Sequence, residues 1–340
     1  MKNLIFDLCN ATGISGDEKA IADVCIEKLA PFAEVSTDKN SNVIAVLGNK
    51  EADKTILLDA HMDRIGFIVT QINSNGFVKV DSCGGIDIRT LADTAVITSG
   101  KDRITGVVCC NPPHLSDGNE DKAVSMDKVW IDFGMPYDEV IKKVKIGDSL
   151  TFLNNPMELL NNRIAAAALD NRCGVASLIR CAELLSDEKL DYKVVILLST
   201  QEETFGTGAK TGAFSLSADE SIVVDVSFAS QPDVSGQYVG IELSKGPMIC
   251  ISPILNREMT DKLIEIAEKE SIPFQYEPIS ASTGTNADHI SVTKSGVKTA
   301  LVSIPQRNMH TQNEIIAIDD VENTAKLIAE YIKGGGVANG

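Results

Sequence analysis

Short apolar runs alternate along this chain with segments in which apolar residues recur every three or four positions. The continuous runs at 42–47, 55–58, 193–199, 221–226 and 299–304 predict buried strands. Helical spacing predicts helices from Ser15 to the proline at 31, from Asp170 onward, over 258–270 and over 319–332. Ser15 and Glu18 have the spacing of a capping box, so we expect this pair to begin the first helix. The alternation is typical of a layered α/β domain.

The pattern changes between about residues 66 and 155, where short β-type runs dominate. The runs at 67–70, 77–80, 95–98 and 105–108 are separated by glycine, asparagine and aspartate turns, which is typical of a small barrel or sandwich. A polar, proline-bearing loop is expected at 111–125, and the α/β pattern returns near residue 164. We therefore predict an α/β/α domain made of residues 1–65 and 160–340, with a small β domain of residues 66–159 inserted into it.

The charge and hydrophobicity of the chain argue against two kinds of partner, nucleic acids and membranes. The 340 residues carry a net charge of −17, which argues against nucleic-acid binding, because that function requires a basic surface. No apolar stretch approaches the length of a membrane span, and the N-terminus lacks the apolar core and cleavage site of a signal peptide. We therefore expect a cytoplasmic protein without a membrane or nucleic-acid partner.

The cysteines do not suggest a metal site. All eight are scattered, and none forms a Cys-x-x-Cys pair. In a reducing compartment, cysteines of this kind pack as small apolar residues. Cys109 and Cys110 are adjacent, so in a strand their side chains would point to opposite faces and chelate a metal poorly. A zinc–thiolate site is therefore not expected.

Acidic and imidazole side chains follow several of the predicted strands. Glu202 and Glu203 come directly after the apolar run at 194–198, and two adjacent carboxylates resist joint ionisation unless a cation compensates them. A divalent metal would do so, with one glutamate as its ligand and the other as a base toward water. His61 and Asp63 lie on the same side of an extended chain, so the carboxylate of Asp63 could orient the imidazole.

Three further residues have a similar location. Asp170 stands at the start of a predicted helix, Asp225 ends an apolar strand, and His310 follows another. Ligands bind at the carboxyl ends of strands in an open α/β sheet, and this mix of groups suits one or two ions such as zinc, cobalt or manganese. Each residue alone has a simpler explanation, namely a helix N-cap, a turn and a hydrogen-bonded buried histidine. His114 is expected at the surface or in packing, and the role of His289 is open.

A family pattern runs along nearly the whole chain. Its segments, in order, are 12–18 (TGISGDE), 60–67 (AHMDRIGF), 169–172 (LDNR), 200–203 (TQEE) with 206–209 (GTGA), 224–225 (VD) and 307–311 (RNMHT), accompanied by 112–115 (PPHL) and 245–247 (KGP). With these segments the chain closely resembles the M42 family of metallo-aminopeptidases. Any one segment is weak evidence, but their joint order is specific.

The resemblance implies a centre of two divalent metal ions, zinc in the first place, with cobalt or manganese as alternatives. Asp170 would bridge the two ions. The other ligands that the resemblance implies are His61 and Asp225 for one ion, and Glu203 and His310 for the other.

The resemblance also implies an activity, the removal of N-terminal residues from short peptides by a water shared between the two ions. Glu202 would act as the general base and then as the acid, while Asp63 would support His61. The implied fold is a zinc-peptidase-like α/β/α domain whose inserted β-barrel makes dimer contacts. Many members of the family assemble further, into hollow tetrahedral dodecamers.

Three positions depart from the family pattern without removing a ligand. Arg64 stands where glutamate is usual, Asn286 where aspartate is common, and Asn308 where tyrosine is usual. They leave the specificity and the assembly contacts open. Other functions also stay open at this point: a deacylase or carboxypeptidase with the same metal centre, and a metal-stabilised scaffold without catalysis.

Overall fold

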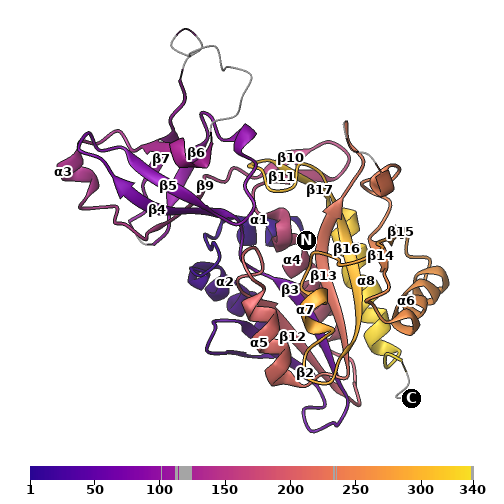
Figure 1. The fold of residues 1–340 in the computed structure, drawn as a ribbon. Helices are drawn as coiled ribbons and strands as arrows, with labels where there is room; N and C mark the ends of the chain where they lie inside the picture. The colour runs from indigo at the N-terminus through magenta and orange to yellow at the C-terminus, as the bar shows by residue number, and fades with distance from the viewer. Residues whose placement is uncertain (101, 112–113, 115–124, 233, 235, 338–340) are drawn as a thin grey trace.

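The computed structural model describes residues 1–340 except 101, 112–113, 115–124, 233, 235 and 338–340, so most of the predicted loop at 111–125 lies outside the described residues. Its larger body, the sheet domain, is built around one eight-stranded sheet (Figure 1). In spatial order the strands are β1 (Glu34–Thr37), β2 (Val43–Gly48), β12 (Lys193–Ser199), β3 (Thr55–His61), β13 (Glu220–Phe228), β16 (Lys298–Gln306), β14 (Met248–Ile251) and β15 (Gln275–Pro278).

The four central strands decide where a site can form. β12, β3, β13 and β16 are parallel neighbours, so their carboxyl ends lie along one edge of the sheet. All seven residues of β3 are buried, because helices cover both faces of the sheet, and this explains its apolar run at 56–58. Polar residues occur where these strands end.

Helices cover the two faces unequally. One face carries α1 (Lys2–Asn10), α2 (Lys19–Leu29), α4 (Leu169–Leu185), α6 (Arg257–Lys269) and α8 (Ile318–Lys333), whose apolar sides share a core with β3 and β13. The other face carries α5 (Thr207–Leu216) and the short α7 (Ala287–Ile290). Small residues such as Ala209 and Ala213 let α5 pack closely against Leu57 and Leu197.

A closed barrel projects from the sheet domain (Figure 1). Its core contains Phe67 and Phe152, which meet edge to face with 5.5 Å between ring centroids. The short helix α3 (Tyr137–Val140) and the 3₁₀ turns η1 (Ile88–Thr90) and η3 (Met126–Lys128) connect its strands. In order around the barrel these strands are β4 (Gly66–Ile72), β5 (Val78–Cys83), β8 (Trp130–Asp132), β7 (Thr105–Val108), β6 (Ala95–Thr98) and β9 (Ser149–Phe152).

A three-stranded sheet joins the two bodies. It consists of β10 (Met157–Leu159), β11 (Arg163–Ala166) and β17 (Glu314–Ala317), paired antiparallel. β11 leads directly into α4, and β17 follows the loop after β16. One further 3₁₀ turn, η4 (Gly236–Tyr238), lies between β13 and β14.

The predicted α/β/α domain with an inserted β-barrel is confirmed, and the central strands lie where the apolar runs predicted them. The helix α1 was not predicted. The capping box was wrong: α2 begins at Lys19, and the side chain of Glu18 makes no cap hydrogen bond. Both predicted capping residues bond elsewhere, because the Ser15 hydroxyl donates to Asp63 and Glu18 accepts from the backbone of Gly16.

Two further observations concern membrane-spanning helices and the state of the cysteines. None of the described helices is both long enough and apolar enough to cross a membrane. The eight cysteines are all free thiols, five of them buried in the interior.

Candidate metal centre

The predicted site residues converge at the carboxyl edge of the central strands. His61 is the last residue of β3 and is paired with Ser199 of β12, so Glu202 and Glu203 follow in the turn beyond that strand. Asp225 lies in β13. The remaining two come from outside these strands: Asp170 from the non-helical start of α4, and His310 from the loop between β16 and β17.

The first group of close ligand atoms surrounds His61. Its Nε2 lies 3.2 Å from Oδ1 of Asp170 and 3.6 Å from Oδ1 of Asp225. All three side chains are buried, and their ligand atoms lie within 4.8 Å of one another. Asp170 is therefore not an ordinary N-cap, since its carboxylate faces the two histidines of the centre.

The second group surrounds His310. Its Nε2 lies 3.2 Å from Oδ2 of Asp170 and 3.4 Å from Oε2 of Glu203. The carboxylate of Asp170 thus offers one oxygen to each histidine and belongs to both groups. A carboxylate placed in this way would suit two neighbouring cation positions.

The electrostatics of the centre test whether a cation fits there. Burial raises the pKa of Glu202, His61 acts to lower it, and the charges of Asp225 and Asp170 add to the rise, so that the pKa lies at about 8. Burial also raises the pKa of Glu203, again with the charge of Asp170, and its Oε1 is buried without a hydrogen-bond partner. Divalent cations would relieve this repulsion, and imidazole with carboxylate ligands suits zinc, cobalt or manganese. The donor set therefore fits divalent metals.

The neighbouring carboxylates also raise the pKa values of the two histidines. Burial acts to lower the pKa of His310, yet the hydrogen bond to Asp170 and the charge of Glu203 raise it to about 10. The pKa of His61 likewise rises well above its usual value, because the charge of Glu202 and the contact with Asp170 outweigh burial. Metal ions would take the place of these protons, since a ligating imidazole must be neutral.

Asp63 organises the turn that carries the two glutamates. Its carboxylate accepts the backbone N–H of Glu202 over 3.0 Å and that of Glu203 over 3.2 Å, and it also accepts the hydroxyl of Ser15. Its Oδ1 lies 3.5 Å from Nδ1 of His61, which is longer than the 3.2 Å between that nitrogen and the backbone oxygen of Asp63. The carboxylate therefore contacts the glutamate turn more closely than it contacts the imidazole.

Two buried polar residues near the centre were missed as site residues. Glu314 accepts the backbone N–H of Asp170 and that of His310, and it was not singled out although it follows His310 by four positions. Asn286 was noted only as a departure from the family pattern. Its Nδ2 donates to Oδ2 of Asp59 and to Oγ of Ser199, both over 2.9 Å.

The other two departures lie outside the ligand groups. Arg64 is 2% exposed, and its backbone bridges to Ile14, so its side chain does not line an open surface. Burial lowers the pKa of its guanidinium to about 10, and the charge of Arg172 adds to that effect. Asn308 is exposed, with a φ of 55°, and donates to the backbone oxygen of Asn313.

The other histidines lie apart from the centre. His114 is exposed, as predicted. His289 packs against the glutamate turn, because a Cβ added at Gly206 would come within 2.3 Å of its ring.

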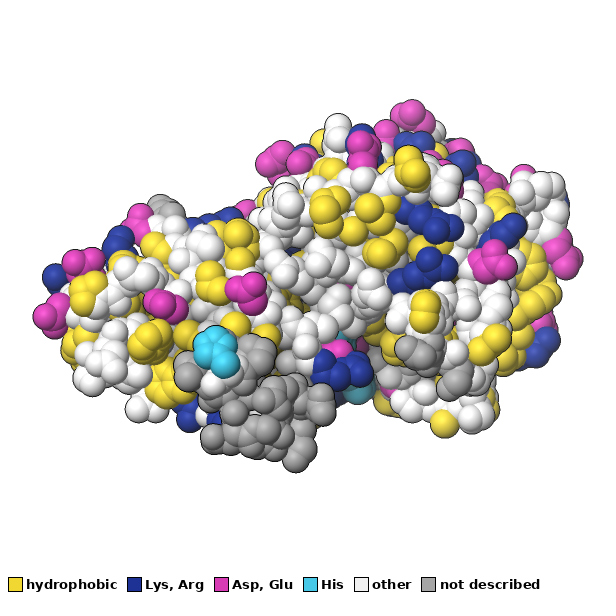
Figure 2. All heavy atoms as spheres, turned by 90° about the horizontal axis from the view of Figure 1, so that it is seen from above, with side chains coloured by type: hydrophobic (Ala, Val, Ile, Leu, Met, Phe, Trp, Pro, Cys, Tyr) yellow, Lys and Arg dark blue, Asp and Glu magenta, His cyan; other side chains and the backbone are white. Residues whose placement is uncertain are grey.

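The barrel reaches the centre through the loop after β5. A Cβ added at Gly85 would lie 3.1 Å from Nδ1 of His310, so the backbone of this loop touches that ring. The side chain of His310 is 31% exposed, whereas that of Glu203 is only 4% exposed. Histidine and acidic side chains reach the surface where the barrel meets the sheet domain (Figure 2).

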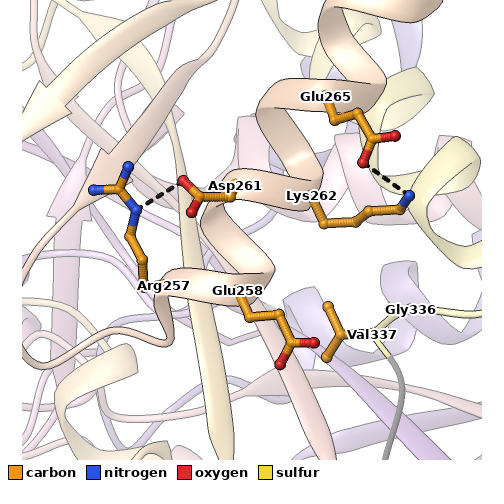
Figure 3. Close-up of a pocket in the computed structure, with 7 residues that line it drawn as sticks. All are labelled: Arg257, Glu258, Asp261, Lys262, Glu265, Gly336 and Val337. Carbon is orange, nitrogen blue, oxygen red and sulfur yellow. Dashed lines mark hydrogen bonds and ion pairs between the residues drawn. The ribbon is translucent and has the colours of Figure 1, made fainter.

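A separate cavity of about 630 Å³ lies beside α6 and the residues Gly336 and Val337 (Figure 3). Four of its charged residues are paired along the helix, in the 2.7 Å contact of Arg257 with Asp261 and the 3.0 Å contact of Lys262 with Glu265. No histidine lines it. Within the described residues, the side chains that could bind a metal together therefore lie in the two groups around His61 and His310 and not in this cavity.

Comparison with known proteins identifies the family. The sequence model of the M42 glutamyl aminopeptidase family matches residues 41–327. A lysyl aminopeptidase from Pyrococcus furiosus is 34% identical over 331 residues, which cover 95% of this chain and 94% of that protein.

Solved structures of peptidases have the same fold as this chain. Aminopeptidase APDkam598 from the archaeon Desulfurococcus kamchatkensis superposes with a TM-score of 0.91 at 31% identity, covering 98% of this chain and 94% of that one. A Pyrococcus horikoshii TET1 peptidase, described as able to assemble into a tetrahedron or a large octahedral shell, gives a TM-score of 0.85 at 30% identity, covering 96% and 98%. The chain therefore belongs to the M42 family of metal-dependent aminopeptidases.

Proposed function

We propose that this aminopeptidase removes N-terminal residues from short peptides with two divalent cations, one held by His61, Asp170 and Asp225 and the other by Asp170, Glu203 and His310. The observation that carries the proposal is the position of Asp170, whose two oxygens each lie 3.2 Å from a different histidine. When bound, the cations would supply Lewis acidity, which acidifies water and stabilises negative charge on a substrate carbonyl oxygen. Zinc is the first expectation for their identity, with cobalt or manganese as alternatives.

Glu202 is the proposed general base and acid. It belongs to neither ligand group, and its Oε2 is 3.8 Å from Nε2 of His61, so its carboxylate remains free for proton transfer. Its side chain is 18% exposed, more than those of Asp170 and Asp225 at 7%. Glu202 would take a proton from the attacking water and return it to the leaving amine.

Asp63 has a positioning role in this proposal. Because its carboxylate accepts the N–H groups of both Glu202 and Glu203, it fixes the proton-transfer group relative to the proposed ligand beside it. Any change in Asp63 would therefore move both glutamates together.

The experiment that tests the proposal starts from chelator-stripped protein. The protein is reloaded with zinc, cobalt or manganese and assayed with a panel of aminoacyl-7-amino-4-methylcoumarin substrates, while the bound metal is counted by elemental analysis. We expect restored cleavage of free-amine substrates at two ions per chain. The same substrates with an acetylated amine serve as the matched control and should not be cleaved. Cleavage of the acetylated substrates, or full activity at one ion per chain, would contradict the proposal.

A homo-oligomer is also proposed, with the inserted β domain as its contact surface. The support is the likeness to the Pyrococcus horikoshii TET1 peptidase and the apolar side chains that the barrel exposes. Among these, Ile146 is 71% exposed, Tyr137 40% and Ile141 39% in the single chain. Light scattering on the wild type and on Ile146→Lys tests this, with dissociation expected in the variant. A monomeric wild type would contradict it.

The cytoplasmic location stays a prediction. Its support is chemical, because eight free cysteines persist best in a reducing compartment.

The division of the chain into one domain of residues 1–65 and 160–340 and a second domain of residues 66–159 also stays a prediction. At the end of the second range, β10 pairs with β11, so the strand at 157–159 belongs to the three-stranded sheet.

A further inference from the structure

Glu314 makes two contacts that no other described acid makes. Its Oε2 accepts the backbone N–H of Asp170 over 3.0 Å, and its Oε1 accepts the backbone N–H of His310 over 2.9 Å. The residue is 2% exposed. One buried carboxylate thus holds the main chain of two proposed metal ligands that lie 140 positions apart in the sequence.

The strand pairing explains how Glu314 reaches both segments. It begins β17, and its partner in β11 is Ala166, so its side chain lies at the point where the chain approaches Asp170. On the other side, Arg307 bridges to Ile315, which closes the loop that carries His310. The first residue of β17 therefore stands between the two ligand-bearing segments.

The two contacts do not serve both cation positions equally. Asp170 and His310 supply two of the three residues in the group with Glu203, but only Asp170 belongs to the group with His61 and Asp225. A loss of either contact would therefore disturb the second group more than the first. Outer hydrogen bonds of this kind orient ligands, and their removal typically lowers metal affinity by about 10–100-fold.

We propose that Glu314 is a positioning residue that holds Asp170 and His310 in register for the second cation. The inference rests on the proposed two-cation site. It requires a group with two acceptors, because each carboxylate oxygen receives one N–H. Glutamine would keep one acceptor and turn an NH₂ group toward the other N–H, so Glu314→Gln removes one contact at nearly unchanged volume.

The test is a titration of chelator-stripped protein with Co²⁺, followed by calorimetry and by the visible absorption of the bound ion. For Glu314→Gln we expect the affinity for the second ion to fall about 10–100-fold, the first ion to change less, and the absorption of the second ion to shift. Glu314→Asp retains the charge but is too short to reach both N–H groups, so the same result is expected. If Glu314→Gln does not fold, the metal affinities can still be measured with Glu314→Asp.

Glu220→Gln is the matched control. Glu220 is equally buried in β13, but it pairs with Lys54 over 2.6 Å and accepts the hydroxyl of Tyr331 and the N–H of Val337, away from the centre. We expect it to bind both ions with wild-type affinity. Wild-type affinities in both Glu314 variants, or an equal loss in Glu220→Gln, would overturn the positioning role. If the wild type itself takes up fewer than two ions, the two-cation proposal fails instead, and this inference fails with it.

Discussion

Asn286 donates a 2.9 Å hydrogen bond from its side-chain amide to Oδ2 of Asp59, and both side chains are buried. Asp59 lies two residues before His61 on the same face of β3, so this pair lies next to a proposed metal ligand. Burial raises the pKa of Asp59 to about 7, while the hydrogen bonds from Ser199 and Asn286 act against that rise. A neutral donor at position 286 therefore stabilises the charged form of Asp59.

Asn286→Asp should destabilise the protein, because it replaces this donor with a second buried carboxyl. We expect a loss of about 1–3 kcal/mol in the free energy of unfolding at pH 8, measured in denaturant. The loss should be smaller at pH 5, since an added proton removes the repulsion and the folded pKa values are raised. Asn40→Asp is the control, because Asn40 is half-buried and its side-chain amide donates to the neutral hydroxyl of Thr211, while its backbone N–H donates to Asp38. Equal effects of the two substitutions would contradict this explanation.

Glu202→Gln should abolish most of the turnover while metal binding stays intact. The proposed base lies outside both ligand groups, so glutamine removes proton transfer without removing a ligand. We expect kcat to fall by about 10²–10⁴-fold, the usual scale for a positioned base. Steady-state kinetics with an aminoacyl-coumarin substrate and elemental analysis of the same sample check both parts. Near-normal turnover in the variant would exclude Glu202 as the base.

Asp170→Ala should disturb both cation positions, whereas Asp225→Ala should disturb one. The difference follows from geometry, since Asp170 faces both histidines and Asp225 faces only His61. Elemental analysis after dialysis against trace metal should give clearly fewer ions per chain for the first variant than for the second. One fully occupied ion in Asp170→Ala would rule out the bridging assignment.

The sequence predicted the central strands and the proposed ligands because both depend on local signals. The run at 193–199 is apolar at its five inner positions and became β12 with those bounds. Acids or histidines at strand ends converge wherever parallel strands share an edge. Even so, the convergence of Asp170 with the strand residues came from the family pattern, since helix starts carry acids for simpler reasons.

The rest could not be predicted, because it depends on long-range contacts. Ser15 and Glu18 have a capping box spacing, yet both side chains bond to the loop and turn that carry the site. The contacts of Glu314 with Asp170 and His310 arise only when β17 pairs with β11. A one-dimensional pattern does not record which backbone N–H a buried acid will meet.

Gly85→Ala should weaken the enzyme through His310, although Gly85 belongs to the barrel side of the molecule. The added Cβ would lie 3.1 Å from Nδ1 of His310, a distance at which the ring must shift by a few tenths of an ångström. Small displacements of a reacting geometry are costly, so we expect kcat/KM to fall about 10-fold while the unfolding free energy changes by less than about 1 kcal/mol. Gly334→Ala is the control, because its Cβ would meet only backbone oxygens at 3.5 Å, an ordinary contact. Steady-state kinetics and denaturant unfolding on both variants check the prediction. Full activity in Gly85→Ala would show that the barrel loop does not hold the ring of His310.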